Sequence, residues 1–239
     1  MIENALAYDE KFTEILFSSG FLGQKIYADY QTQKKSTTNS FYILGNCGFM
    51  LSGTNLTVCG KLTGEDVEQI LFFCSFFGVN TIESTQRIES LKVDKELEIM
   101  KYVGGGTSFQ QGIIKNENIY LFIKFCCENF DGLSFDNVYA NFVRKVNGGI
   151  SDIYYLKKDS RIVSGAITTQ YFDDTEYITF VSTANEFRNS GMANKILAHI
   201  ISQKEGKIIL LKCEKQLCEF YQRAGFKPIG KIIVNKFEG

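Results

Sequence analysis

The chain has very little of what metal and disulfide chemistry require. It contains one histidine, and its seven cysteines include no C-x-x-C pair. Zinc sites need cysteine and histidine clustered at short spacing, and disulfide frameworks usually use an even number of cysteines. The sequence therefore predicts neither a metal site nor structural disulfides. Reduced cysteines are typical of the cytoplasm.

Long apolar segments are missing as well. The most apolar stretch, residues 70–79, is about half as long as a membrane-spanning helix must be. The first ten residues, MIENALAYDE, lack the basic and apolar pattern of a secretory signal peptide. We therefore expect a cytoplasmic protein that makes no membrane contacts.

An excess of positive charge is also absent. The net charge is −1, whereas general nucleic-acid binders usually carry a clear basic excess, so no nucleic-acid partner is expected. The charges are spread unevenly, because residues 1–105 carry nine basic and 13 acidic side chains and residues 106–239 carry 17 and 14. The small basic excess of the second half is compatible with an anionic ligand there.

What the sequence does contain is a glycine-containing loop between an apolar strand, residues 177–183, and an amphipathic helix. The helix repeats apolar side chains at the spacing of Ile196 and Ile200. The loop RNSGMA opens this helix, where unpaired backbone N–H groups and the helix dipole favour phosphate. The predicted phosphate-binding residues are Arg188, Asn189, Ser190, Gly191, Met192, Ala193 and Asn194. A solvated surface charge is the alternative interpretation of Arg188.

A second motif, YQRAGF at residues 221–226, follows after a predicted strand at 207–213. In this order the two motifs resemble those of the GCN5-related N-acetyltransferases, the GNAT superfamily. In that family a Q/R-x-x-G-x-G/A loop binds the pyrophosphate of acetyl-CoA. A Y-x-x-x-G-F segment closes the following helix and opens the last strands. The resemblance covers the second half of the chain.

The predicted elements of residues 106–239 follow the order of a GNAT domain. Two helices at 117–129 and 134–146 precede a hairpin of strands 153–158 and 161–172, and the two motifs follow. The resemblance implies a mixed α/β fold (an α+β mixed sheet) for this domain. The glycine-rich segment 104–108 is the expected linker to a first domain, residues 1–105.

The first domain shows a weaker form of the same order. Its predicted elements are a helix at 4–18, strands at 25–30, 41–44, 48–52 and 56–59, a helix at 65–77 and strands at 80–84 and 97–103. Glu65 and Asp66 lie where the phosphate loop would be. Their carboxylates stabilise the positive end of the helix dipole, and they would repel a pyrophosphate placed there. We therefore expect a smaller GNAT-like domain that lacks a CoA loop. An unrelated α/β domain is the alternative.

The resemblance also implies how the ligand is held. Acetyl-CoA is expected as the acetyl-donor substrate, with no metal. The backbone at Val181 and Thr183 is expected to pair with the pantetheine amides. In the family this strand separates from the next one, here residues 207–213, and leaves a slot for the thioester.

Tyr221 matches the family position of the tyrosine that often protonates the departing CoA sulfur. A second interpretation of Tyr221 comes from its neighbours, because Leu217, Phe220 and Ala224 complete a normal buried helical stripe with it. Both interpretations are open at this stage.

The general base is less clear from the sequence. Many relatives have asparagine where this chain has Glu214, whose carboxylate could take a proton from the amine or bind a cationic acceptor. A surface acid paired with a neighbouring lysine is the alternative. Asp173, Asp174 and Glu176 are further candidate bases, and His199 is predicted on the solvated face of its helix.

These features predict an acetyl-CoA-dependent N-acetyltransferase that transfers an acetyl group to a primary amine of a small molecule. The amine would attack the thioester directly in a ternary complex. Two alternatives are open: a catalytically idle acetyl-CoA-binding or interaction module, and an acyltransferase acting on a peptide, a protein or aminoacyl-tRNA.

Overall fold

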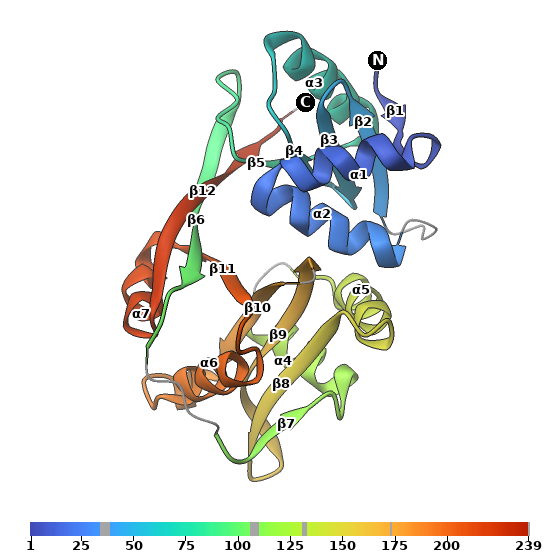
Figure 1. The fold of residues 1–239 in the computed structure, drawn as a ribbon. Helices are drawn as coiled ribbons and strands as arrows, with labels where there is room; N and C mark the ends of the chain where they lie inside the picture. Colours follow the sequence, from blue (N-terminus) through green and yellow to red (C-terminus); the bar gives the residue numbers. More distant parts are fainter. Residues whose placement is uncertain (34–38, 106–109, 131–132, 173, 239) are drawn as a thin grey trace. The chain divides into compact units, whose positions relative to one another are not determined.

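The mixed α/β class predicted from the sequence is confirmed by a computed structural model of the chain (Figure 1). The structure describes residues 1–33, 39–105, 110–130, 133–172 and 174–238. The chain forms two compact units, of which unit 1 comprises Met1–Glu98 and Gly230–Gly239 and unit 2 comprises Ile99–Ile229. Residues 106–108 of the expected linker lie outside the described residues, so the domain boundary at 105/106 stays a prediction.

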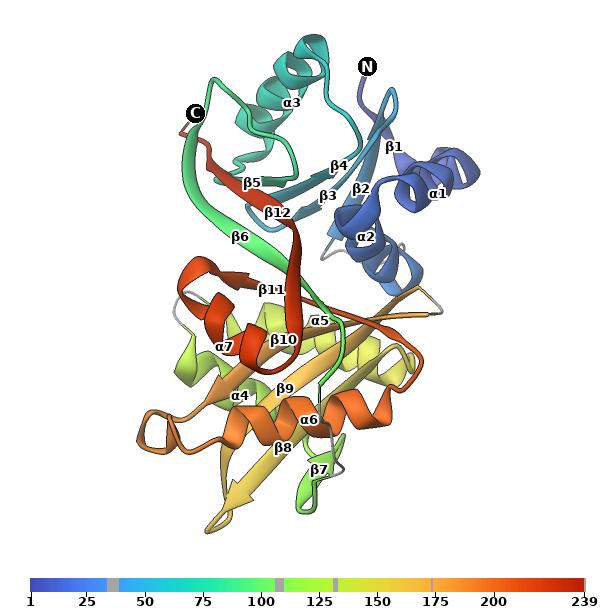
Figure 2. The ribbon, with the colours of Figure 1, turned by 60° about the vertical axis from the view of Figure 1, so that its left-hand side comes forward.

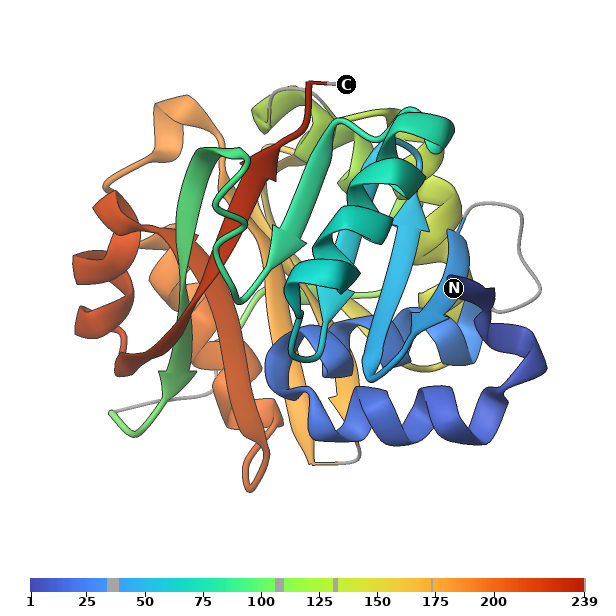
Figure 3. The same ribbon diagram turned by 90° about the horizontal axis from the view of Figure 1, so that it is seen from above.

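Unit 1 is a sheet with helices on both faces. Its elements are β1 (Glu3–Asn4), η1 (Ala5–Ala7), α1 (Asp9–Ser18), α2 (Gly20–Gln33), β2 (Asn39–Leu44), β3 (Cys47–Ser52), β4 (Asn55–Cys59), α3 (Gly64–Phe77), β5 (Thr81–Ser84) and the first part of β6 (Lys92–Tyr102). Strands β1 to β5 are neighbours in chain order, and β5 pairs with the end of β12 (Phe226–Lys236). Helix α3 covers one face, and α1 and α2 cover the other (Figure 3).

One predicted element of unit 1 is wrong. Residues 25–30 form part of helix α2 and not a strand. The spacing explains the error, because Leu22, Ile26 and Tyr30 are buried at intervals of four residues, which places them on one face of a helix. The aromatic and β-branched residues of this short segment favour a strand locally, and tertiary packing overrides that preference.

The start of α3 is closed by its own side chains. The Thr63 hydroxyl accepts the backbone N–H of Asp66 at 3.2 Å, and the Asp66 carboxylate accepts the N–H of Thr63 at 2.9 Å. This reciprocal pair is a capping box, in which the Thr63 hydroxyl satisfies a first-turn N–H and the Asp66 carboxylate satisfies the N–H of the N-cap residue. Gly78 ends the helix with a φ of 63°. The positive end of α3 is therefore already occupied by a negative charge.

Unit 2 contains the two motifs. Its further elements are β7 (Ile113–Lys115), α4 (Ile119–Asn129), α5 (Phe135–Asn147), β8 (Ser151–Lys158), β9 (Arg161–Phe172), β10 (Thr175–Thr183), η2 (Asn185–Phe187), α6 (Met192–Gln203), β11 (Ile208–Glu214), η3 (Lys215–Leu217) and α7 (Cys218–Arg223). The strand order is β6-β11-β10-β9-β8-β7, with β7 to β10 antiparallel and β10 parallel to β11.

Helix α6 lies on one face of this sheet, and α4 and α5 lie on the other (Figure 2). Adjacent residues of β9 show the alternation, since Ala166 is buried with the α6 residues Ile196 and Ile200 whereas Ile167 is buried with Phe122 of α4 and Phe142 of α5. Both faces are thus covered by apolar side chains. Within the described residues, no helix is long and apolar enough to cross a bilayer.

Candidate functional site

Strands β10 and β11 separate halfway along their length. Their parallel register runs from Thr175↔Ile208 to Ile178↔Leu211. Both strands then continue, β10 to Thr183 and β11 to Glu214, but in these described segments they share no further register partners. The separation that the resemblance implies is therefore present. It leaves backbone N–H and C=O groups of β10 unpaired on the β11 side, where a ligand can bond them.

A β-bulge lies at the point of separation. Between Thr179↔Ile167 and Ser182↔Gly165, two residues of β10 oppose one residue of β9, and Phe180 within this step has a φ of 51°. A bulky residue in the left-handed region costs about 1–2 kcal/mol. The Phe180 ring packs edge-to-face against Phe130 at 5.6 Å and Phe142 at 5.5 Å between ring centres. Such pairs contribute about 0.5–1.5 kcal/mol each, which is comparable to the strain.

The loop that follows β10 leaves the start of α6 open. Gly191 precedes the helix with a φ of 78°, and in this described segment no side chain caps the first turn. Asn189 also has a positive φ, of 60°, a conformation that asparagine tolerates. The N–H groups of the first turn are therefore available at the positive end of the helix, unlike those of α3.

Two side-chain bonds order the loop, one to the end of β10 and one to η2. The Arg188 Nε donates to the carbonyl of Thr183 at 3.3 Å, and the Ser190 hydroxyl donates to the carbonyl of Phe187. Both bonds use carbonyl acceptors, so they consume none of the loop amides. Arg188 is exposed at the entrance of the loop, and its bond to Thr183 links the loop to the separated end of β10.

A pocket of about 440 Å³ lies between the loop, the end of β10 and α7. It is lined by Val181, Thr183, Phe187, Arg188, Asn189, Gly191, Met192, Ala193, Asn194, Leu217, Phe220, Tyr221 and Arg223. Eight of the predicted binding residues and Tyr221 therefore line one pocket. Ser190 and Glu214 do not belong to the lining. Sequence reasoning missed Phe187 and Arg223, because a lone aromatic or basic residue on an exposed helix or turn carries no distinguishing pattern.

Tyr221 is both a core residue and a pocket residue. Its side chain is 6% exposed and packs against the rings of Phe220 and Phe226, at 5.0 Å and 6.0 Å. Burial raises the pKa of Tyr221 well above its ordinary value, with smaller contributions from Cys213 and Tyr177. The phenol therefore stays protonated at neutral pH, which is the state that a proton donor needs.

Glu214 lies at the end of β11 with its side chain exposed. Its carboxylate accepts a hydrogen bond from the Gln216 side chain at 2.8 Å. The neighbouring thiols of Cys213 and Cys218 lie 3.8 Å apart.

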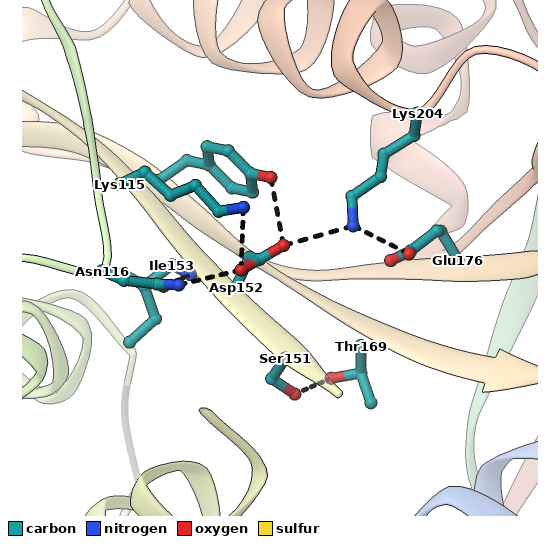
Figure 4. A network of polar contacts seen from close by, with 9 residues as sticks. Lys115, Asn116, Ser151, Asp152, Ile153, Thr169, Glu176 and Lys204 are labelled. Carbon is teal, nitrogen blue, oxygen red and sulfur yellow. Dashed lines mark hydrogen bonds and ion pairs between the residues drawn. The ribbon is translucent and has the colours of Figure 1, made fainter. Parts of the chain in front are cut away.

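The other candidate bases lie at the opposite end of β10 from the pocket. Glu176 is 3% exposed, and its carboxylate is 2.8 Å from the Lys204 Nζ, which also lies 3.2 Å from Asp152 (Figure 4). Asp174 accepts a hydrogen bond from the Thr175 hydroxyl, and Asp173 lies outside the described residues. Glu176 thus belongs to an ion-pair network that joins β8, β10 and the end of α6.

Burial opposes the charges of this network, and its hydrogen bonds and ion pairs outweigh that cost. Lys115 and Asn116 also bond Asp152, at 3.1 Å and 2.8 Å (Figure 4). Although burial would raise the pKa of Asp152, Asn116 and the two lysines lower it below its ordinary value. The pKa of Lys204 is raised, because Glu176 and Asp152 outweigh the effect of burial.

The prediction of a solvated His199 is wrong. The side chain is 7% exposed, and its ring lies 5.8 Å from that of Tyr154. Because α6 also packs against β8, His199 is covered, whereas Lys195 and Gln203 of the same helix stay exposed. Burial lowers the pKa of His199, so the ring is neutral at pH 7. Among the described residues, no three His, Cys, Asp or Glu side chains form a group that could hold a metal ion.

Residues 150–228 match the family model described as Acetyltransferase (GNAT) domain. The fold is similar to that of a tandem GNAT protein from the clavulanic acid biosynthesis pathway, with a TM-score of 0.64 and 8% identity over 100% of this chain and 99% of that one. The fold is also similar to that of an acetyltransferase of the GNAT family from Colwellia psychrerythraea, with a TM-score of 0.62 and 12% identity over 100% of both chains. A GCN5-related N-acetyltransferase from Kribbella flavida has a TM-score of 0.62 and 12% identity, over 90% of this chain and 95% of that one.

At these identities the structural likeness establishes the fold, and it extends over both units of the chain. A comparison with curated proteins gives no match.

We predict that the ion-pair network stabilises unit 2. Lys204→Met leaves Glu176 and Asp152 without their shared cation and should lower the free energy of unfolding by about 3 kcal/mol at pH 7. Lys204→Arg keeps the charge and should lower the free energy of unfolding by less. Denaturant unfolding at several pH values provides the measurement.

The pH dependence of this stabilisation follows from the carboxylate of Asp152. Asp152 has a lowered pKa in the folded protein, so it stabilises the fold above its ordinary pKa, and this contribution is lost as pH falls through the folded pKa. The difference between the wild type and Lys204→Met should therefore narrow as the pH falls from 7 toward 3. Equal stability of the two proteins at pH 7 would contradict this role of Lys204.

Proposed function

We propose that this protein is an acetyl-CoA-dependent N-acetyltransferase that acts on a primary amine, because residues 150–228 match the GNAT acetyltransferase family model. The observation that carries the proposal is the pocket of about 440 Å³ at the separated ends of β10 and β11. It combines unpaired strand backbone, an uncapped helix start and a buried tyrosine. These three features match the three parts of the donor: two pantetheine amides, a pyrophosphate and a thioester sulfur.

The loop and the strand bind the donor. The backbone N–H groups from Asn189 to Asn194 hold the pyrophosphate, and the charge of Arg188 stands at the entrance of the loop. The backbone of Val181 and Thr183 pairs with the pantetheine amides in place of β11. Arg223 lines the same pocket from α7 and supplies a second guanidinium for the phosphates.

The reaction is a direct transfer. The amine nitrogen attacks the thioester carbonyl carbon and forms a C–N bond, and the tetrahedral intermediate collapses as the C–S bond breaks. Tyr221 donates its hydroxyl proton to the leaving sulfur, because the phenol lines the pocket and is protonated at neutral pH. The bound geometry converts a reaction of two molecules into one within a complex.

The amine must lose a proton, and we propose that Glu214 receives it. This carboxylate stands at the end of β11, on the strand that separates from β10 and leads into α7. Its bond to Gln216 leaves its second oxygen available for a proton.

Unit 2 alone binds CoA in this proposal. We propose that residues 1–105 form a GNAT-like domain without a CoA loop and residues 106–239 the acetyltransferase domain. The capping box of Thr63 and Asp66 supports this, because its carboxylate occupies the helix end that a pyrophosphate would need. The likeness of the whole chain to a tandem GNAT protein also supports two domains of this fold. A cytoplasmic location fits the seven cysteines, all present as thiols.

The binding site can be tested at Gly191. An added Cβ would meet open space there, and asparagine and aspartate both tolerate a positive φ. Titration of the wild type with acetyl-CoA in a calorimeter should give one site per chain. Gly191→Asp should weaken binding at least tenfold, whereas the equally large but neutral Gly191→Asn should retain most of it. Equal affinity of the two folded variants, or two sites per chain, would refute the assignment.

The acid can be tested by Tyr221→Phe, which keeps the ring and its packing. A general acid contributes about 10²–10⁴ in rate, so kcat for thioester consumption with an accepted amine should fall by about that factor. The dissociation constant of acetyl-CoA should hardly change, because the proton is needed only as the sulfur leaves. Tyr171→Phe, at a buried tyrosine outside the pocket lining, is the control. A fully active Tyr221→Phe enzyme would show that Tyr221 is a core residue and not the acid.

The base can be tested by Glu214→Gln, which keeps an oxygen to accept the Gln216 hydrogen bond. If Glu214 receives the amine proton, kcat/KM for the amine should fall about 10²-fold or more. Glu205→Gln, at another exposed glutamate, is the matched control. An unchanged kcat/KM for the amine in Glu214→Gln would show that the proton leaves by another route.

A further inference from the structure

Phe180 differs from the other residues with a positive φ. In the described part of the chain, the remaining non-glycine residues of this kind are small and polar, namely Asn116, Asp159, Ser160 and Asn189. Phe180 is bulky, aromatic and lies within a strand. A strained conformation of this kind persists only where the surrounding structure enforces it, and it often lies at a functional site.

The strain coincides with the opening between the strands. The last register pair of β10 with β11 is Ile178↔Leu211, and the bulge follows directly, between Thr179 and Ser182. One extra residue in a strand reverses the faces of all later side chains. The bulge therefore decides that Val181 and Thr183 line the pocket while Phe180 packs into the core under α4 and α5.

Two aromatic rings hold Phe180 in this position. Phe130, at the end of α4, and Phe142, in α5, both meet its ring edge-to-face, with interplanar angles of 87° and 86°. Phe142 is 6% exposed and belongs to the buried core of this face of the sheet. The three rings lie on the opposite face of the sheet from α6 and the loop that precedes it.

We propose that Phe130, Phe142 and Phe180, here called the aromatic clamp, are positioning residues that keep the end of β10 away from β11 and so maintain the slot for the pantetheine thioester. This inference rests on the proposed function. In this account the clamp touches no substrate. It acts by populating the open form of the strand pair before acetyl-CoA arrives, which raises the apparent affinity for the donor.

The clamp predicts a kinetic pattern opposite to that of Tyr221. Phe142→Leu and Phe130→Leu keep an apolar side chain but remove the ring pair with Phe180. Each should weaken acetyl-CoA binding about two- to tenfold and raise KM for acetyl-CoA by the same factor. Because saturating donor restores the open form, kcat should stay near the wild-type value.

The matched control is Phe125→Leu. Phe125 is buried in the same core as Phe142, and its ring contact is with Phe122 and not with Phe180. It should lower the melting temperature about as much as Phe142→Leu while leaving the affinity and KM for acetyl-CoA unchanged. A general loss of packing would change the acetyl-CoA affinity and KM of both variants alike. Phe130 is half-buried, so Phe130→Leu provides a milder second variant.

A ligand-free measurement separates this inference from the proposed function. The backbone ¹³C chemical shifts of Phe180 report the sign of its φ. They should change toward ordinary strand values in Phe142→Leu and Phe130→Leu and stay constant in Phe125→Leu. Wild-type shifts in both clamp variants, with unchanged acetyl-CoA affinity, would overturn the clamp. If the wild type binds no acetyl-CoA, the proposed function fails, and the shifts alone decide whether the clamp holds the bulge.

Discussion

The organisation of unit 2 depends on one interruption of backbone pairing. Strands β10 and β11 share their hydrogen-bonding edges only as far as Ile178↔Leu211. Two paired strands would satisfy their own N–H and C=O groups and offer nothing to a ligand. Because the pairing stops, the sheet can remain a folded scaffold at one end of β10 and a binding edge at the other. The pocket between this edge, the loop and α7 follows from that.

The two ends of β10 are stabilised by different forces. At its beginning, Glu176 is fixed by Lys204 in a network of charges that also includes Asp152. At its end, no ion pair among the described residues holds the strand, and the aromatic rings of Phe130 and Phe142 meet the strained Phe180 instead. An apolar anchor suits this end, since it uses none of the backbone N–H and C=O groups of β10 that lack a β11 partner beyond Ile178.

The first turns of α3 in unit 1 and α6 in unit 2 differ in their capping. In unit 1, Asp66 reaches back to the N–H of Thr63 and neutralises the positive end of α3. In unit 2, Gly191 carries no side chain, and the first turn of α6 remains open. Two helices of similar length therefore differ in whether their first turn carries a side-chain cap, because of a few residues at that turn. This contrast supports a single CoA site per chain.

The sequence by itself determined most of the local elements and the glycine-containing turn before α6, because helix spacing, a glycine at a helix start and the YQRAGF motif are written in consecutive residues. It also determined the capping acids of α3. Tertiary structure decided the rest. Residues 25–30 became helical through the burial of Leu22, Ile26 and Tyr30 together, and His199 became buried through packing of α6 on β8. The separation of β10 from β11 and the φ of Phe180 depend on contacts between residues far apart in the chain, which no local pattern encodes.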